Sequence, residues 1–63
     1  MTTLVAHSLA AAGKDLWFRC RRDINPEVAV GERVMVARGL GPANPICEVE
    51  SIDDRMIVAR KIS

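Results

Sequence analysis

Two segments of the sequence decide the fold: residues 31–38 read G-E-R-V-M-V-A-R, and residues 46–62 read I-C-E-V-E-S-I-D-D-R-M-I-V-A-R-K-I. Apolar and charged side chains alternate along both, and a period of two is typical of an antiparallel strand with one buried and one solvated face. The turn candidate Asp53-Asp54 divides the second segment into the two arms of a hairpin. We therefore predict that residues 1–63 form a single all-β domain, a small five-stranded OB-like or SH3-like barrel.

The composition leaves little material for a stabilising cross-link. A chain of 63 residues forms at most one domain, whose core contributes no more than about 3–5 kcal/mol without a staple or a partner. Its Cys and His residues are Cys20, Cys47 and His7, too few for a four-ligand zinc site, and we expect neither a metal nor a cofactor. Both cysteines lie in alternating apolar segments, so we interpret them as buried thiols, with a disulfide or a reactive thiol as the alternatives.

Charge and hydropathy indicate a soluble chain. Nine basic and eight acidic residues give a formal net charge of +1, which by itself predicts no binding to nucleic acid. No apolar run approaches the roughly 18 residues of a membrane span. Residues 1–12 lack the basic start and the apolar length of a secretory signal. We expect a cytoplasmic protein.

The N-terminal third contains one ambiguous segment and one clear strand. Residues 1–12 are compatible with an amphipathic helix that Gly13 would end, or with a strand, which we favour because the rest of the chain is β-rich. Residues 15–22, D-L-W-F-R-C-R-R, alternate as a strand does. One face of this strand is expected to point into the core and holds Leu16, Phe18 and Cys20. The opposite face holds Trp17, Arg19 and Arg21.

Two connections interrupt the strands. Residues 23–31 contain Pro26, which removes a ladder donor and excludes a central strand. Three apolar residues of this connection are expected to close over the core: Ile24, Val28 and Val30. Residues 39–45, G-L-G-P-A-N-P, form a loop rich in Gly and Pro, either a plain hairpin tip or a recognition loop that presents Leu40.

The alternation also predicts the core and the solvated charges. Glu48 and Glu50 are expected to lie across from Arg60 and Lys61 as cross-strand ion pairs on a wet face. Gly31 suits a tight turn before the next strand. The predicted core consists of Leu16, Phe18, Val34, Val36, Val49, Met56 and Val58.

No arrangement of residues predicts catalysis. The carboxylate pairs are explained by a wet strand face and by a turn, whereas general acid–base chemistry needs such groups in a cleft. The sequence contains no nucleophile elbow, phosphate-binding glycine loop, H-E-x-x-H or C-x-x-C motif. We expect no enzymatic activity.

Over residues 14–62, the order of three short motifs resembles the pattern found in the soluble C-terminal domain of NfeD-like proteins. The matched segments are K-D-L-W-F-R, G-E-R-V-M-V and D-R-M-I-V, which place on the family pattern Trp17, Gly31, Val34, Val36, Met56 and Val58. The resemblance implies a five-stranded OB-type barrel. It also implies a protein-interaction module, which in that family acts beside membrane-associated stomatin-like or flotillin-like proteins.

Two functions remain open from the sequence. The first is a non-catalytic protein-interaction module or small adaptor subunit, binding another protein or a second copy of itself through Trp17, Arg19, Arg21 and the Leu40 loop. Here Trp17 is either a partner-facing residue beside two arginines or the cover of an open barrel end. The alternative is a nucleic-acid-binding β-barrel. Its aromatic and basic strand face would consist of Trp17, Phe18, Arg19, Arg21, Arg22 and Arg33.

Overall fold

The part of the chain that the computed structural model describes, residues 1–6, 17–37 and 44–62, consists of strands and turns and contains no α-helix. The elements are β1 (Thr3–Val5), β2 (Trp17–Arg21), a 3-10 turn η1 (Arg22–Ile24), β3 (Arg33–Ala37), β4 (Ile46–Ile52) and β5 (Met56–Lys61). The prediction of a small all-β domain is therefore confirmed. No segment of these described ranges forms the long apolar helix that would be needed to cross a membrane.

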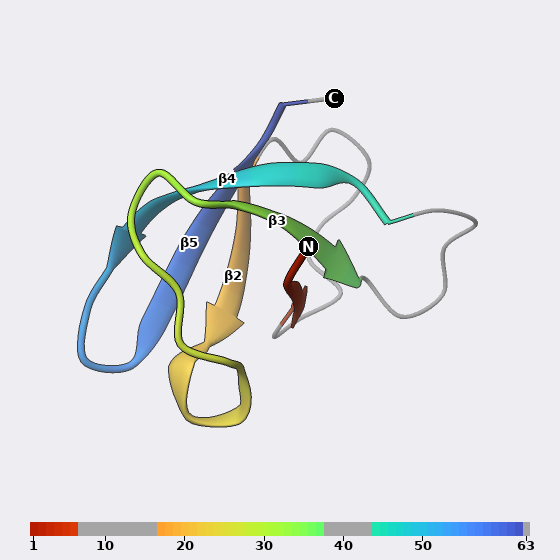
Figure 1. The fold of residues 1–63 in the computed structure, drawn as a ribbon. Helices are drawn as coiled ribbons and strands as arrows, with labels where there is room; N and C mark the ends of the chain where they lie inside the picture. The colour runs from red at the N-terminus through yellow and green to blue at the C-terminus, as the bar shows by residue number, and fades with distance from the viewer. Residues whose placement is uncertain (7–16, 38–43, 63) are drawn as a thin grey trace.

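All five strands belong to one sheet, in the order β1-β3-β4-β5-β2. Strands β3, β4 and β5 form an antiparallel meander, β2 is antiparallel to β5, and β1 is parallel to β3. Figure 1 shows β3 and β4 crossing β5 and β2, so the sheet is strongly curled. Strands β1 and β2 lie at its two edges and are not paired with each other. The sheet is thus open along a seam between β1 and β2.

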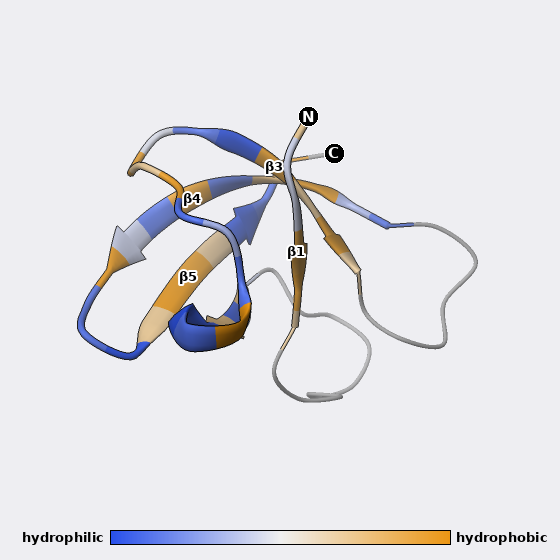
Figure 2. Cartoon of the chain, turned by 60° about the horizontal axis from the view of Figure 1, so that its bottom comes forward, coloured by the Kyte–Doolittle hydropathy of each residue, from blue (hydrophilic) through white to orange (hydrophobic). Residues whose placement is uncertain are grey.

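The core fills the inside of this curl. Polar and apolar residues alternate along β4 (Figure 2), and every strand contributes at least one fully or almost fully buried side chain. The buried residues are Leu4, Phe18, Cys20, Val34, Val36, Cys47, Val49, Ile57 and Ala59. The predictions for Phe18, Val34, Val36 and Val49 are confirmed, whereas Leu16 lies outside the described residues.

The prediction for the last strand was wrong by one residue. Ile57 and Ala59 are buried, whereas Met56 and Val58 are only half-buried. The cause is the pairing with β2, which places Ala59 opposite Phe18. Residues that are directly opposite in an antiparallel pair share a face, so the inward Phe18 brings Ala59 inward, and the small alanine leaves room for the phenyl ring.

A β-bulge in β4 shifts the alternation of that strand. The register passes from Val49 opposite Ala59 to Ser51 opposite Val58, so Glu50 is the extra residue. A bulge places two residues opposite one. Glu50 and Ser51 are therefore both exposed, and Ile52 comes opposite the buried Ile57. Without the bulge, strict alternation would turn Ser51 toward the core.

The connection from η1 to β3 closes over the core only in part. Val28 packs against the core cluster, but Ile24 and Val30 are exposed, so the prediction for these two residues was wrong. Val30 occupies a tight turn in which the Glu32 amide donates to the Ala29 carbonyl at 3.0 Å. The next residue, Gly31, has a φ of 91°, which a turn of this kind needs and which non-glycine residues rarely adopt.

One end of the seam is bridged by the side chain of Asn25. The Val5 amide donates to its Oδ1 at 2.6 Å, and its Nδ2 donates to the Val5 carbonyl at 3.2 Å. The same Nδ2 donates to the Arg21 carbonyl at 2.6 Å. The side-chain amide thus takes the place of a peptide group and joins the last residue of β1 to the last residue of β2.

Both cysteines are buried as thiols, as predicted. Burial raises the pKa of Cys20 to about 11, and the neighbouring Cys47 contributes to the increase. The Sγ of Cys47 lies 3.9 Å from the Pro45 carbonyl oxygen. A raised thiol pKa keeps Cys20 protonated at neutral pH, the state expected of a packing residue rather than a nucleophile.

Candidate functional site

The outer face of the sheet, the face opposite the core, is the candidate site because it exposes the aromatic and basic residues of β2. Trp17, Arg19 and Arg21 are exposed and alternate with the buried Phe18 and Cys20. The predicted division of β2 into a core face and a solvated face is confirmed. Trp17 is 51% exposed, which leaves half of a large aromatic side chain available for contact.

Strand β5 supplies the neighbours of these side chains on the outer face. Trp17 lies opposite Arg60, and Arg19 lies opposite the half-buried Val58. Directly opposed residues such as Arg19 and Val58 lie about 5 Å apart, and diagonal ones such as Trp17 and Val58 lie about 7–8 Å apart, within reach of an aromatic side chain, so the three form one surface. It is apolar at Val58 and at the indole ring, and cationic at its border.

Glu50 holds the indole of Trp17 in place. The Trp17 Nε1–H donates to the Glu50 carboxylate across β5. The bulge makes this contact available, because Glu50 is the unpaired extra residue of β4 and faces solvent. An aromatic side chain with few rotamers that is also hydrogen-bonded loses little entropy when a partner covers it.

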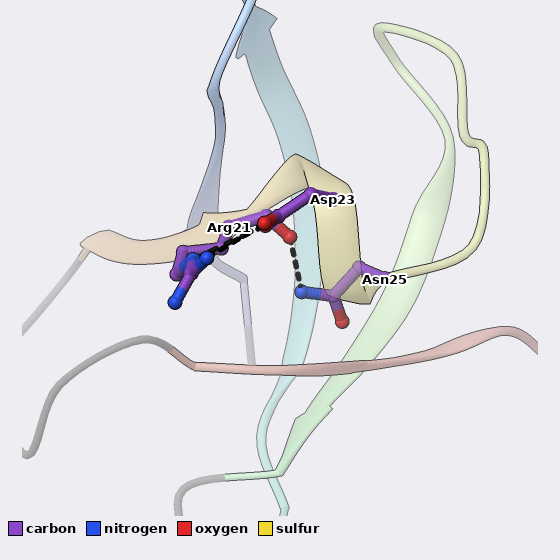
Figure 3. Close-up of polar contacts among 3 residues, drawn as sticks. All are labelled: Arg21, Asp23 and Asn25. Atoms are coloured by element: carbon purple, nitrogen blue, oxygen red, sulfur yellow. Dashed lines mark hydrogen bonds and ion pairs between the residues drawn. The ribbon is translucent and has the colours of Figure 1, made fainter.

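Arg21 is paired within its own turn. Its guanidinium donates to the Asp23 carboxylate at 2.6 and 3.1 Å, as Figure 3 shows. This bond lowers the pKa of Asp23. The pair borders a shallow hollow of about 470 Å³ that is lined by Arg21, Asp23, Asp54, Arg55 and Met56. Because two arginines and two aspartates line this hollow, it has no single sign of charge.

Arg22 braces the β4–β5 hairpin rather than belonging to the outer face. Its amide donates to the Arg55 carbonyl at 2.9 Å, and its Nη1 donates to the Asp53 carbonyl at 2.9 Å. Asp53 in turn accepts the Arg55 and Met56 amides through Oδ1, both at 2.8 Å. These backbone bonds lower the pKa of the Asp53 carboxyl and make the turn an Asx turn.

Two of the remaining predicted site residues, Arg33 and Phe18, are described by the structure and do not join Trp17 on one exposed surface. Arg33 on β3 lies opposite Glu48 on β4, and Glu48 in turn lies opposite Arg60 on β5. Arg33 is therefore three strands away from Trp17, which lies opposite Arg60. Phe18 is 5% exposed, so the prediction that it joins a base-stacking face was wrong. Leu40 lies outside the described residues. Glu48 is opposite Arg60 as predicted, but Lys61 is opposite Cys47 rather than Glu50.

Two polar residues that hold the site in place were not predicted from the sequence: Glu50, which binds the Trp17 indole, and Asn25, which joins β1 to β2. The spacing V-E-S-I, with apolar residues three apart in a strand of period two, was the signal for a bulge at Glu50. No sequence signal pointed to Asn25 as a bridge, since an Asn before Pro predicts only a turn. Within the described ranges no group of three or more His, Cys, Asp or Glu side chains could hold a metal ion.

Comparisons with protein-family models, with curated proteins and with solved structures find no significant match to this chain. The resemblance to the NfeD-like family therefore stays a prediction from its short motifs.

Proposed function

We propose that this chain is a non-catalytic protein-interaction module that contacts its partner through the outer face around Trp17. The observation that supports this most strongly is that Trp17 is half exposed and yet held by a hydrogen bond to Glu50. A solvated tryptophan with no binding role gains little from such fixing. An immobilised aromatic anchor with arginine beside it has the composition of a binding hot spot.

The surroundings of Trp17 favour a protein partner. Val58 and Met56 on the same face are half-buried, so a partner would cover apolar surface as well as charge. Aromatic residues, Met and Arg are enriched in the centres of protein interfaces. Arg19 and Arg60 border this surface and supply polar contacts at its rim.

The charges on the outer face make nucleic acid the weaker alternative. Glu48 lies between Arg33 and Arg60 in the cross-strand register, and Glu50 adjoins the indole of Trp17. Carboxylates at these places repel a phosphate backbone, whose binding depends on uninterrupted positive charge. The burial of Phe18 leaves one exposed aromatic residue on β2 for base stacking.

A retention experiment with matched variants tests the proposal. The immobilised chain is exposed to proteins of the source cells, and wild type is compared with Trp17→Ala, Glu50→Ala and Glu50→Gln. We expect a discrete partner to be retained by wild type and by Glu50→Gln, whose amide oxygen still accepts the indole N–H, but retained less by Glu50→Ala. Trp17→Ala should lose about tenfold or more in affinity, as hot-spot residues do. Equal retention by Trp17→Ala would contradict the proposal.

The nucleic-acid alternative is tested by titration of Trp17 fluorescence. Single-stranded DNA and RNA are added at two salt concentrations. Our proposal predicts no quenching by either. Quenching that falls steeply with salt would instead support phosphate contact and replace the proposed function.

A further inference from the structure

The outer edge of β2 presents peptide groups that no described strand pairs with. The Arg22 amide bonds to the Arg55 carbonyl, which fixes the alternation of the antiparallel ladder with β5. Hydrogen-bonded and non-hydrogen-bonded pairs alternate along such a ladder. Cys20 and Phe18 precede Arg22 by two and four residues, so their peptide groups face β5 as those of Arg22 do, whereas those of Arg19 face the seam.

The opposite side of the seam is already occupied at one end. The bonds from the Met35 amide to the Thr2 carbonyl and from the Ala6 amide to the Ala37 carbonyl turn the peptide groups of Val5 away from β3. Both Val5 groups bind the Asn25 side chain, as does the Arg21 carbonyl. Among the described residues, Asn25 therefore ends the unpaired edge at Arg21, and the part of β2 without a described strand partner centres on Arg19.

A second copy of this chain is a poor occupant of the edge. Two β2 strands paired antiparallel through their Arg19 peptide groups would place Arg19 opposite Arg19 of the other copy, and a shift by two residues would place Arg19 opposite Arg21 or Trp17. Like charges directly opposite each other destabilise a strand pair, which disfavours the Arg19–Arg19 and Arg19–Arg21 registers, and the Arg19–Trp17 register gives the arginine no carboxylate partner. Arginines on an edge strand therefore oppose self-pairing, while the same charges attract an acidic strand.

We infer that β2 binds an extended acidic segment of a partner protein, which adds to the sheet as a sixth, antiparallel strand. This inference rests on the proposed function and names the chemistry of its partner. Main-chain bonds to Arg19 supply affinity, and alternate side chains of the added strand supply specificity. An acidic side chain lies opposite Arg19 on the outer face, next to the fixed indole of Trp17.

The test uses a short capped peptide of alternating Glu and Val and two N-methylated forms of it. In an antiparallel pair, the residue opposite Arg19 directs its own peptide groups toward β2. If Glu lies opposite Arg19, methylation of the Glu amides blocks pairing, whereas methylation of the Val amides leaves it intact. We expect the Glu-methylated peptide to bind on the order of tenfold more weakly or worse, from the loss of backbone hydrogen bonds.

Charge exchange provides a second and independent measurement. A peptide of alternating Lys and Val should bind wild type on the order of tenfold more weakly than the Glu peptide. Arg19→Glu should reverse this preference, and Lys61→Glu, an exposed charge change on β5, should leave it unchanged. Amide hydrogen exchange should show rapid exchange at Arg19 in the unbound protein and protection when the Glu peptide is added.

Each contrary result overturns the inference in a different way. Equal binding of the two methylated peptides would mean that charge alone attracts them. Protection of the Arg19 amide in the unbound protein would mean that the chain itself covers this edge. If no peptide binds but Trp17→Ala still abolishes retention of a partner, strand addition is wrong and the proposed protein-interaction function is supported. If no peptide binds and Trp17→Ala also leaves retention unchanged, both proposals are wrong.

Discussion

The position of Ile57 gives the sharpest prediction for the fold. Ile57 is 1% exposed and lies opposite Cys20 and Ile52 on the inside of the sheet, whereas its neighbour Val58 is half-buried on the outer face. Substitution of the two residues should therefore have unequal consequences. Ile57→Val and Ile57→Thr test the core side, and Val58→Thr provides the matched change on the outer side.

The magnitudes follow from burial. Ile57→Val removes one buried methylene, worth about 0.8 kcal/mol, and leaves a small cavity, so we expect about 1 kcal/mol of destabilisation. Ile57→Thr also buries a hydroxyl, which adds about 1–3 kcal/mol if it finds no partner. Since the core of a domain of this size contributes no more than about 3–5 kcal/mol, Ile57→Thr should unfold a large fraction of the protein. Val58→Thr keeps a β-branched residue at a solvated position and should stay within about 0.5 kcal/mol of wild type.

Urea unfolding followed by Trp17 fluorescence and by circular dichroism measures these differences. For a domain of this size, 1 kcal/mol corresponds to about 4–8 °C in Tm, so Ile57→Val is resolved in a thermal scan as well. A larger loss for Val58→Thr than for Ile57→Val would show that β5 faces the other way. The bulge at Glu50 and the pairing with β2 would then be wrong as well.

Three further predictions concern the turns and the seam. Asn25→Asp removes the amide donor to the Val5 and Arg21 carbonyls and should cost about 1–3 kcal/mol in urea unfolding, whereas a loss within experimental error would contradict the bridging role. Gly31→Ala should cost about 1 kcal/mol in the same assay because of the positive φ, and an unchanged or raised stability would contradict that conformation. Folding lowers the pKa of the Asp53 carboxyl. The contribution of Asp53 to stability is therefore complete above the ordinary carboxyl pKa and is lost as the pH falls through the pKa of the folded state. Asp53→Asn should flatten the acid side of the curve of stability against pH, and an unchanged acid side would refute this role of Asp53.

Alternation predicted β2, β3 and most of the core because those strands follow a strict period of two. It failed at β5, where both faces are apolar: Met56 and Val58 are as hydrophobic as Ile57 and Ala59. Only the pairing with Phe18, a contact between distant parts of the chain, decides which face is buried. No local pattern contains that information.

The candidate site was predictable to a similar extent. The parity of β2 placed Trp17 and Arg19 on the solvated face. The parity of β2 alone does not predict their neighbours, because Glu50 reaches Trp17 through a bulge in β4, and Val58 lies opposite Arg19 through the register of β5. The bridge made by Asn25 depends on the ends of two edge strands lying close together, which its turn motif does not predict.

Photo-crosslinking in the cells that produce the protein shows whether the outer face around Trp17 is a protein-binding surface. A crosslinking residue is placed at Val58, beside Arg19 on the outer face, or at Val30, an exposed turn position, as the control. We expect a discrete protein adduct from position 58 that Arg19→Glu abolishes, and none from position 30. Adducts with nucleic acid, or equal adducts from both positions, would contradict it.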